Sequence, residues 1–307
     1  MLPHFLVIGA QKAGSTYVLE CLRAHPEIYM PRAEVPFFEG ELYHADRLDQ
    51  FERHFDAACA GQIIGVKRPN WLGSPECPSR IAKHLPEVKL IAILRNPVER
   101  AVSAYFHYMA SGFIPIRPIE VGMPDLLDGK YDHLPRAREI IEFGFYRKHL
   151  MNYERYFATE RIHVALLDDF RPEPKPALEA MFRFLGVDPS FLPAGTDRRP
   201  MAAPYSITRL RLRTACHGLI FKHSRDSAYL EPRRNPLSRA VNLANTAIDR
   251  NVWARLFNAQ APRLSEELAV RLDAKYATDV NGLRLRLGRP ISHWPTGLTQ
   301  AVREPLH

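Results

Sequence analysis

The sequence predicts an α/β fold with three layers, in which helices flank a central parallel sheet. Four short apolar runs, at residues 5–8, 63–67, 89–94 and 162–167, have the length and composition of buried strands. Segments with a helical spacing of apolar residues separate these runs, and this alternation is typical of parallel sheets with crossover helices. Polar residues follow three of the runs, at the carboxyl ends of strands, where open α/β sheets bind their ligands.

Length and composition fit a single domain over residues 1–307. The chain is 46% hydrophobic and 25% charged, as ordinary globular proteins are. Within this domain we expect an α/β core over 1–190, a mostly helical part over 191–295 and a tail over 296–307. The sequence shows no apolar run as long as a membrane span, no secretion signal and no C-x-x-C pair among its four cysteines. These features predict a cytoplasmic protein in a reducing compartment.

The charge balance is basic, +8 at pH 7, which favours a polyanionic partner such as nucleic acid, an anionic membrane face or a multiply phosphorylated ligand. Much of the excess lies in the C-terminal half, at Arg198, Arg199, Arg209, Arg211, Arg213, Lys222, Arg225, Arg233, Arg234 and Arg239. Aromatic residues do not alternate with these arginines, which argues against a site for single-stranded nucleic acid. For most of them we expect a solvated basic face.

The first apolar run leads into a loop and a helix that together predict an anion site. Gly9 and Gly14 bracket the loop, and a helix is expected over 17–23. The amides of such a loop and the positive end of the helix dipole both point to the place where a phosphate binds. The glycines are five residues apart, as in a nucleotide-binding P-loop, but the lysine is Lys12, inside the loop. The loop therefore resembles a P-loop with its lysine relocated, and an ordinary strand-to-helix turn is the alternative.

Further elements alternate along the first half of the chain. An extended piece is expected at 28–31, and helices at 51–58 and 79–85. The third strand ends at Arg95, after which Asn96 is placed to cap a helix, Pro97 suits its first position and Glu99 suits a capping box. This helix continues to about residue 109 and carries Ser103.

The second half of the chain contains fewer strands. Three prolines between residues 111 and 134 predict a loop or lid. Helices are expected at 146–157 and 178–185, the second closed by Gly186. Beyond residue 200 we expect mostly helix, including an amphipathic helix at 268–283.

The polar residues at the strand ends restrict the chemistry. A nucleoside-triphosphate hydrolase holds Mg²⁺ with a P-loop Ser or Thr and with an acid at a strand end. Here the third strand ends in Arg95, and Asp168 and Asp169, after the fourth strand, are the acids that could take this part. Lys12, Arg95 and the loop amides instead predict a site that is cationic without a metal ion. Such a site suits a nucleotide whose transferable group carries less charge than a triphosphate.

These residues resemble the sulfotransferases that use 3′-phosphoadenosine 5′-phosphosulfate (PAPS), in particular bacterial sulfotransferases and the sulfotransferase domains of heparan sulfate enzymes. One stretch is similar to the family's 5′-phosphosulfate loop: Gln11, Lys12, Ala13, Gly14, Ser15 and Thr16. The stretch 95–105 is similar to its 3′-phosphate segment, where Arg95 and Ser103 would hold that phosphate, and 182–187 and 287–294 match later landmarks. The resemblance covers most of the chain and implies the P-loop-NTPase-like sulfotransferase fold.

The resemblance also implies roles for other side chains. Glu34, in a stretch similar to the heparan sulfate enzymes, would take the proton from the acceptor hydroxyl, since an alcohol is a poor nucleophile at neutral pH. Lys67 would lie near the sulfuryl group or the acceptor, although Arg68 beside it departs from the family pattern. Arg198 and Arg199 lie in a region that often closes over PAPS.

The resemblance therefore implies a sulfotransferase that moves a sulfuryl group from PAPS by in-line displacement, without a metal ion. The acceptor would be a hydroxyl or amine of a small molecule, lipid or glycan, and no stable nucleic-acid partner is expected. His25, His44 and His107 lack metal-ligand spacing, so we expect them to be structural or exposed. Two alternatives stay open: a P-loop kinase acting on a small molecule, and a basic nucleic-acid-binding protein.

Overall fold

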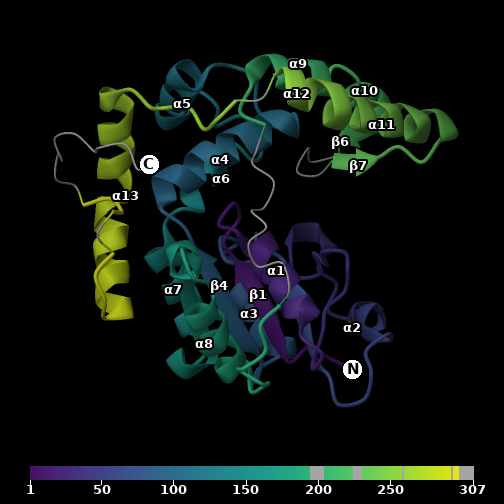
Figure 1. The fold of residues 1–307 in the computed structure, drawn as a ribbon, viewed down its shortest axis with the longest axis vertical. Coiled ribbons are helices and arrows are strands. Elements are labelled where there is room, and N and C mark those ends of the chain that lie inside the picture. The colour runs from purple at the N-terminus through teal and green to yellow at the C-terminus, as the bar shows by residue number, and fades with distance from the viewer. Residues whose placement is uncertain (194–203, 224–229, 258, 292, 297–307) are drawn as a thin grey trace. The chain divides into compact units, whose positions relative to one another are not determined.

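A computed structural model of the chain describes residues 1–193, 204–223, 230–257, 259–291 and 293–296, which form two compact units. Unit 1 comprises Met1–Arg100, Phe145–Pro200 and Thr278–Trp294, and unit 2 comprises Ala101–Gly144, Met201–Ala277 and Pro295–His307. The boundary falls within α4 (Pro97–Ala110) and α13 (Glu266–Leu287), so each of these helices contributes residues to both units (Figure 1).

Unit 1 contains a five-stranded parallel sheet, which confirms the predicted fold class. Its strands are β1 (Phe5–Gly9), β2 (Ile28–Tyr29), β3 (Ile63–Lys67), β4 (Lys89–Leu94) and β5 (Ile162–Leu166), in the order β2-β3-β1-β4-β5. From β1 the chain moves to β2 on one side, and from β4 it moves to β5 on the other. Because the connections diverge at the neighbouring strands β1 and β4, the topological switch point lies at their carboxyl ends, where open α/β sheets bind ligands.

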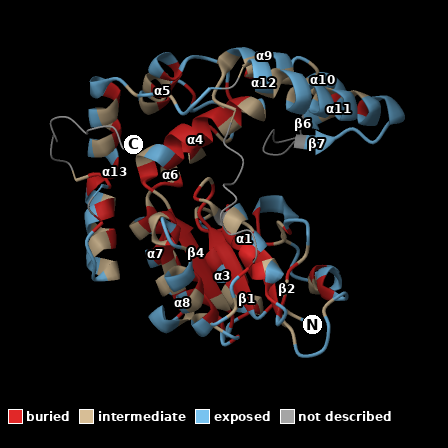
Figure 2. Cartoon of the chain, viewed as in Figure 1, coloured by how far each residue is buried: buried red, intermediate tan, exposed pale blue. Residues whose placement is uncertain are grey.

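A core of unit 1 forms on one face of the sheet, against α1 (Ser15–Ala24) and α8 (Lys175–Leu185). Val7, Ile91 and Ile93 on the strands cluster with Val18 of α1 and Phe182 of α8, and all five are fully buried. Figure 2 shows the strands of this sheet in red, as buried residues. Burial of each such side chain contributes about 1.5–3 kcal/mol, and this packing fixes α1 against β1 and so fixes the ends of the loop between them.

Shorter elements complete unit 1. They are helices α2 (Leu48–Glu52), α3 (Cys77–His84) and α7 (Tyr146–Glu154), and 3₁₀ turns at Gly40–Leu42, Arg53–Phe55, Thr159–Arg161 and Leu167–Phe170. The helix predicted at 51–58 is thus shifted: α2 begins earlier and one 3₁₀ turn follows it. Tyr146 and Tyr153 of α7 donate their hydroxyls to the backbone carbonyls of Arg95 (2.8 Å) and Trp71 (2.9 Å). These bonds attach α7 to the segments that follow β4 and β3.

Unit 2 is largely helical. Its elements are the later part of α4, α5 (Ile119–Leu127), α6 (Glu139–Glu142), α9 (Ile207–Thr214), α10 (His217–Ile220), α11 (Pro236–Ile248), a π-helical segment (Asp249–Trp253), α12 (Ala254–Leu256) and the first part of α13. An antiparallel hairpin of β6 (Phe221–His223) and β7 (Leu230–Pro232) interrupts the part predicted as mostly helical. Within the described ranges, each helix is too short or too polar to span a membrane.

The loop predicted at 111–134 is wrong over Ile119–Leu127, where α5 forms. Ile119, Met123 and Leu126 are buried at helical spacing, and the prolines in this stretch concealed that pattern. Gly122 lets α5 approach α4 closely, because a Cβ atom at this position would lie 1.9 Å from the hydroxyl oxygen of Tyr105.

Candidate active site

The loop between β1 and α1 is closely packed at both of its glycines. Gly14 has a φ of 80°, and a Cβ atom on it would lie 2.5 Å from Cδ1 of Leu167. A Cβ atom on Gly9 would lie 2.6 Å from Cβ of Leu72. Lys12 also has a left-handed backbone, with a φ of 65°, which is uncommon for a residue with a side chain. The shape of the predicted anion loop therefore depends on glycine at both positions.

Lys12 is half-buried, and its ammonium group makes no hydrogen bond or ion pair with any described residue. Burial, and then the positive charges of Arg95 and Lys67, lower the pKa of this group. Cations from the ends of β1, β4 and β3 therefore influence one another at the carboxyl edge of the sheet, where the switch point lies. Because a cluster of cations that includes an unpaired lysine attracts negative charge, this edge is suited to an anionic ligand.

Glu34 belongs to the same group of side chains and is held by two cations. Its Oε1 accepts a hydrogen bond from Nζ of Lys67 and its Oε2 one from Nη1 of Arg68, each at 3.0 Å. Nζ of Lys67 also donates to the hydroxyl of Thr16, in the first turn of α1, at 3.4 Å. The side chain of Glu34 is 38% exposed, whereas that of Lys67 is 7% exposed. The structure thus links Glu34 and Lys67 to the loop and leaves the carboxylate reachable from solvent.

A second carboxylate, Glu39, was missed by the sequence analysis. Nε and Nη2 of Arg68 each donate to one oxygen of Glu39 at 2.6 Å, and the side chain of Glu39 is 5% exposed. Burial disfavours the charged guanidinium of Arg68, but its bonds and charge interactions with Glu39 and Glu34 outweigh burial and raise its pKa. The signals in the sequence were an arginine directly after a predicted strand and two acids five residues apart. Neither signal shows that Arg68 joins both acids.

Arg95 directly follows β4 and pairs with a residue of the next helix. Its Nε and Nη2 lie 2.9 and 2.8 Å from Oε2 of Glu99. Asn96 caps α4 as predicted, since its Oδ1 accepts the N–H of Val98 at 3.0 Å. Glu99 pairs with Arg95 instead of completing a capping box.

The other predicted binding residues fall in three places. Gln11 and Ala13 are buried in the loop, where Nε2 of Gln11 donates to Oδ1 of Asn70 at 3.1 Å, and Ser15 begins α1. Ser103 belongs to unit 2, is 4% exposed, and its hydroxyl makes no hydrogen bond within the described part of the chain. Because Arg95 and Ser103 belong to different units, the binding of one phosphate by both side chains stays a prediction. Arg198 and Arg199 lie outside the described residues.

Comparison with known proteins identifies the family. A family model described as "Sulfotransferase domain" matches residues 2–227. The chain belongs to the sulfotransferase family. This sulfotransferase is 27% identical to mouse heparan sulfate glucosamine 3-O-sulfotransferase 5 over 188 residues, 61% of this chain and 54% of the relative. It is 32% identical to mouse heparan sulfate glucosamine 3-O-sulfotransferase 6 over 190 residues, 60% of this chain and 52% of the relative.

The sulfotransferase thus spans about half the length of these curated relatives. Among solved structures, a sulfotransferase from Alicyclobacillus acidocaldarius matches with a TM-score of 0.65 and 20% identity. That match covers 96% of this chain and 99% of the other. The likeness shows that the two proteins share a fold.

The two acids considered for a metal site have other partners in this sulfotransferase. Asp168 bonds to Nε2 of His293 at 2.9 Å and accepts from the indole of Trp294 at 3.3 Å. Asp169 accepts from the N–H of Leu166 at 2.7 Å and from both Nη atoms of Arg289, at 2.8 and 2.6 Å. Both carboxylates therefore connect the end of β5 to the C-terminal segment of unit 1.

The histidines show no metal site within the described part of the chain. No group of three or more His, Cys, Asp or Glu is arranged there to hold a metal ion. His25 is buried against Phe182, with ring centroids 4.7 Å apart, and its Nε2 bonds to the carbonyl oxygen of Asp188 at 3.0 Å, so it is a structural residue as expected.

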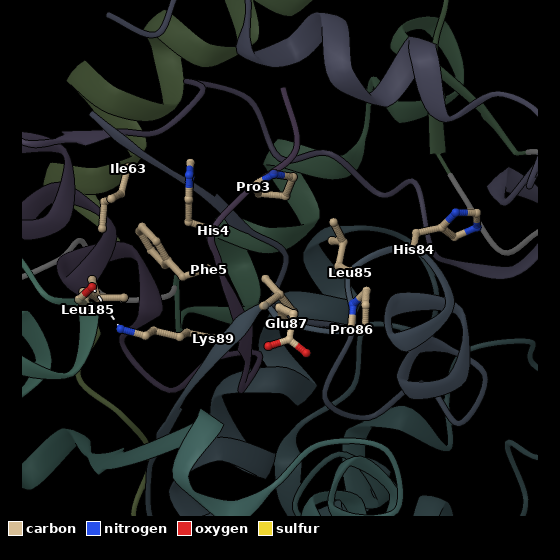
Figure 3. A pocket seen from close by; sticks show the side chains of 11 residues that line it. Pro3, His4, Phe5, Ile63, His84, Leu85, Pro86, Glu87, Lys89 and Leu185 are labelled. Carbon is tan, nitrogen blue, oxygen red and sulfur yellow. Dashed lines mark hydrogen bonds between the residues drawn. The ribbon is translucent and has the colours of Figure 1, made fainter. Parts of the chain in front are cut away.

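A separate pocket lies at the opposite ends of the strands. Figure 3 shows it lined by Pro3, His4 and Phe5 at the start of β1, Ile63 at the start of β3, and the segment 84–89 that leads into β4. Lys89 of this pocket donates from Nζ to the carbonyls of Phe184 (2.6 Å) and Leu185 (3.1 Å), which stabilises the C-terminal end of α8. This pocket is therefore distinct from the site at the carboxyl ends of the strands.

Proposed function

We propose that this sulfotransferase moves a sulfuryl group from PAPS to a hydroxyl or amine of its acceptor, giving adenosine 3′,5′-bisphosphate and a sulfated product. The observation that carries the proposal is the position of Lys12. It is an unpaired, half-buried cation under the influence of Arg95 and Lys67, at the switch point of the sheet. Lys67 in turn bonds to Glu34, so an anion site and a carboxylate base adjoin each other.

The donor is held by the loop and by the segment after β4. The amides of the loop and the N-terminus of α1 bind the 5′-phosphosulfate, as helix N-termini bind phosphates in general. Arg95 binds the 3′-phosphate, and its pairing with Glu99 is exchanged for two parallel bonds to that phosphate. Positive charge at the reacting group comes from Lys12 and Lys67, so the transfer uses no metal ion.

Glu34 acts as the base during transfer. The acceptor oxygen or nitrogen attacks sulfur, the bond from sulfur to the bridging phosphate oxygen breaks, and the electron pair goes to that oxygen. Lys12 stabilises the negative charge that develops on the departing phosphate. The acceptor proton moves to Glu34, whose oxygens each have a lone pair besides the one directed at Lys67 or Arg68. The two cations hold the carboxylate in one orientation while it receives the proton.

The acceptor we propose is a glycan. The curated relatives carry the name heparan sulfate glucosamine 3-O-sulfotransferase, which states a sugar acceptor for those proteins. A screen with glucosamine-containing oligosaccharides, lipids and phenols, read by mass spectrometry as a gain of one sulfuryl group, tests this choice. A sulfated lipid or phenol without any sulfated oligosaccharide would overturn the glycan proposal and leave the sulfuryl-transfer proposal in place.

Binding of adenosine 3′,5′-bisphosphate tests the donor site. Titration calorimetry in the presence of a chelator should show weaker binding for Lys12→Ala and for Arg95→Ala than for the unaltered chain. Lys83→Ala and Arg183→Ala, which change exposed residues of α3 and α8, are matched controls and should bind as the unaltered chain does. Unchanged binding in both site variants contradicts the proposal.

A further inference from the structure

The basic C-terminal half contains a second surface, which sulfuryl transfer does not use. Residues 205–257 contain ten Lys and Arg against three Asp and Glu, a surplus of seven in a chain whose net charge is +8. Seven of the fifteen large hydrophobic side chains that are exposed among the described residues also lie in this stretch. Positive charge and exposed apolar side chains are thus concentrated on the same part of unit 2.

Helix α11 has its polar side turned toward the rest of unit 2. Asn245 donates from Nδ2 to the backbone carbonyl of Arg213 at 2.9 Å. Asp249, in the π-helical segment that continues α11, accepts from Nε and Nη2 of Arg209 at 2.7 and 3.0 Å. Ser238 is 2% exposed and shares this side, since spacings of seven and four residues place the three side chains on one face. Hydrogen bonds to α9 therefore fix the orientation of α11.

The opposite side of the same helix is apolar and faces solvent. The large residues of this apolar face are Leu237, Leu243, Ile248, Val252 and Leu256, which are between 40% and 72% exposed. Exposed alanines at 240, 244 and 247 lie between them. Figure 2 shows α11 in pale blue along most of its length. A surface helix ordinarily buries its apolar side and exposes its polar side, so the reversed arrangement in α11 leaves an apolar face that no described residue of unit 2 covers.

Arginines border the apolar face. Arg234 precedes α11, and Arg239, Arg250 and Arg255 lie on the helix; all four are exposed and lack an ion-pair partner in the part of the chain that the structure describes. A second copy of this chain docking on the same face would bring these like charges together. Nucleic acid would neutralise the arginines but would leave the leucines in water. An anionic lipid surface satisfies both groups, because it offers phosphates at the rim and an apolar interior.

We propose that the apolar face of α11 and α12, with its bordering arginines, docks this sulfotransferase on an anionic membrane surface. Helix α11 (13 residues), the π-helical segment (5 residues) and α12 (3 residues) follow one another without a break from Pro236 to Leu256. Together they form one helical rod about 30 Å long. The rod lies in the plane of the lipid headgroups, with the leucines inserted and the arginines on phosphates. This docking requires neither PAPS nor Glu34, so it is separable from the proposed function.

Co-flotation of the full chain with lipid vesicles tests the proposal. Vesicles of phosphatidylcholine with 30% phosphatidylglycerol should carry the protein, and vesicles of phosphatidylcholine alone should not. The double variant Leu243→Ser with Ile248→Ser should bind the anionic vesicles about tenfold more weakly or worse, because several CH₂ groups no longer enter the lipid. Arg239→Gln with Arg250→Gln should bind more weakly and should lose the salt dependence of binding.

A matched control distinguishes the apolar face from exposed apolar side chains in general. Leu285→Ser changes an 85% exposed leucine of α13 in unit 1 and should bind vesicles as the unaltered chain does. Equal binding by the Leu243/Ile248 variant overturns the proposal, and so does a shift of that variant from dimer to monomer in light scattering, which would identify a second copy as the partner. Binding to duplex DNA that competes with vesicles and survives the serine substitutions would identify nucleic acid instead. Thermal unfolding of each variant confirms that it is folded.

Discussion

The buried ion pair of Arg68 and Glu39 allows a direct test of how much this pair, which lies in the candidate active site, stabilises the fold. Arg68→Ala removes both hydrogen bonds to Glu39, each 2.6 Å long, and leaves a carboxylate that is 5% exposed without its partner. Removal of one partner of a buried ion pair costs about 3–5 kcal/mol. Because Arg68 is 17% exposed and water enters the vacated space, we expect the lower end, about 3 kcal/mol of unfolding free energy. Urea denaturation followed by tryptophan fluorescence measures it.

Two further variants decide whether the burial of Glu39 causes this loss. Arg53→Ala breaks an exposed pair of similar length, Arg53 with Asp49 at 3.0 Å, and should cost less than about 1 kcal/mol. Arg68→Met combined with Glu39→Leu removes both charges and should cost less than Arg68→Ala alone, because no buried charge is left over. The reasoning is refuted if Arg68→Ala costs no more than Arg53→Ala, or if the double variant costs the sum of its single variants.

Three other predictions concern the loop. Lys12→Ala should lower kcat by about 10²–10³, as expected when one group that stabilises a departing oxyanion is removed, and a drop below tenfold contradicts that role. Affinity for adenosine 3′,5′-bisphosphate should fall as pH rises through the pKa of Lys12, because the ammonium group then loses its charge. Burial lowers this pKa below the usual lysine value. In calorimetry, Lys12→Ala should remove this loss of affinity at alkaline pH. Gly14→Ala should lower the urea midpoint more than Gly61→Ala: both glycines have positive φ, but a Cβ atom meets Leu167 only at Gly14.

Much of the α/β core could be predicted because its signals are local. Each of the four apolar runs is a strand, since a buried parallel strand needs a short continuous apolar segment and little else. The loop between β1 and α1 could also be predicted, because Gly9 and Gly14 mark positions where the backbone has no room for a side chain. Asn96 caps α4 by a bond to a residue two positions away, which spacing alone indicates.

The features that escaped prediction depend on residues far apart in the chain. Arg68 and Glu39 are 29 residues apart, and no local pattern shows that a strand end and a turn meet there. The stretch around α5 was predicted as a loop because it contains three prolines, although its apolar residues have helical spacing. The packing against Tyr105 that stabilises this helix is not visible in the sequence. The arginines of the C-terminal half were expected to be solvated, and the sequence does not show which side of α11 faces the protein, since hydrogen bonds from α9 decide it.

The contact of Gly14 with Leu167 connects the loop after β1 to the C-terminal segment of unit 1. Leu167 opens the 3₁₀ turn whose Asp168 is bonded by His293 and Trp294, and Asp169 is bonded by Arg289. The loop after β1 is therefore supported by a turn that Arg289, His293 and Trp294 hold in place, so its conformation depends on a segment far away in the sequence.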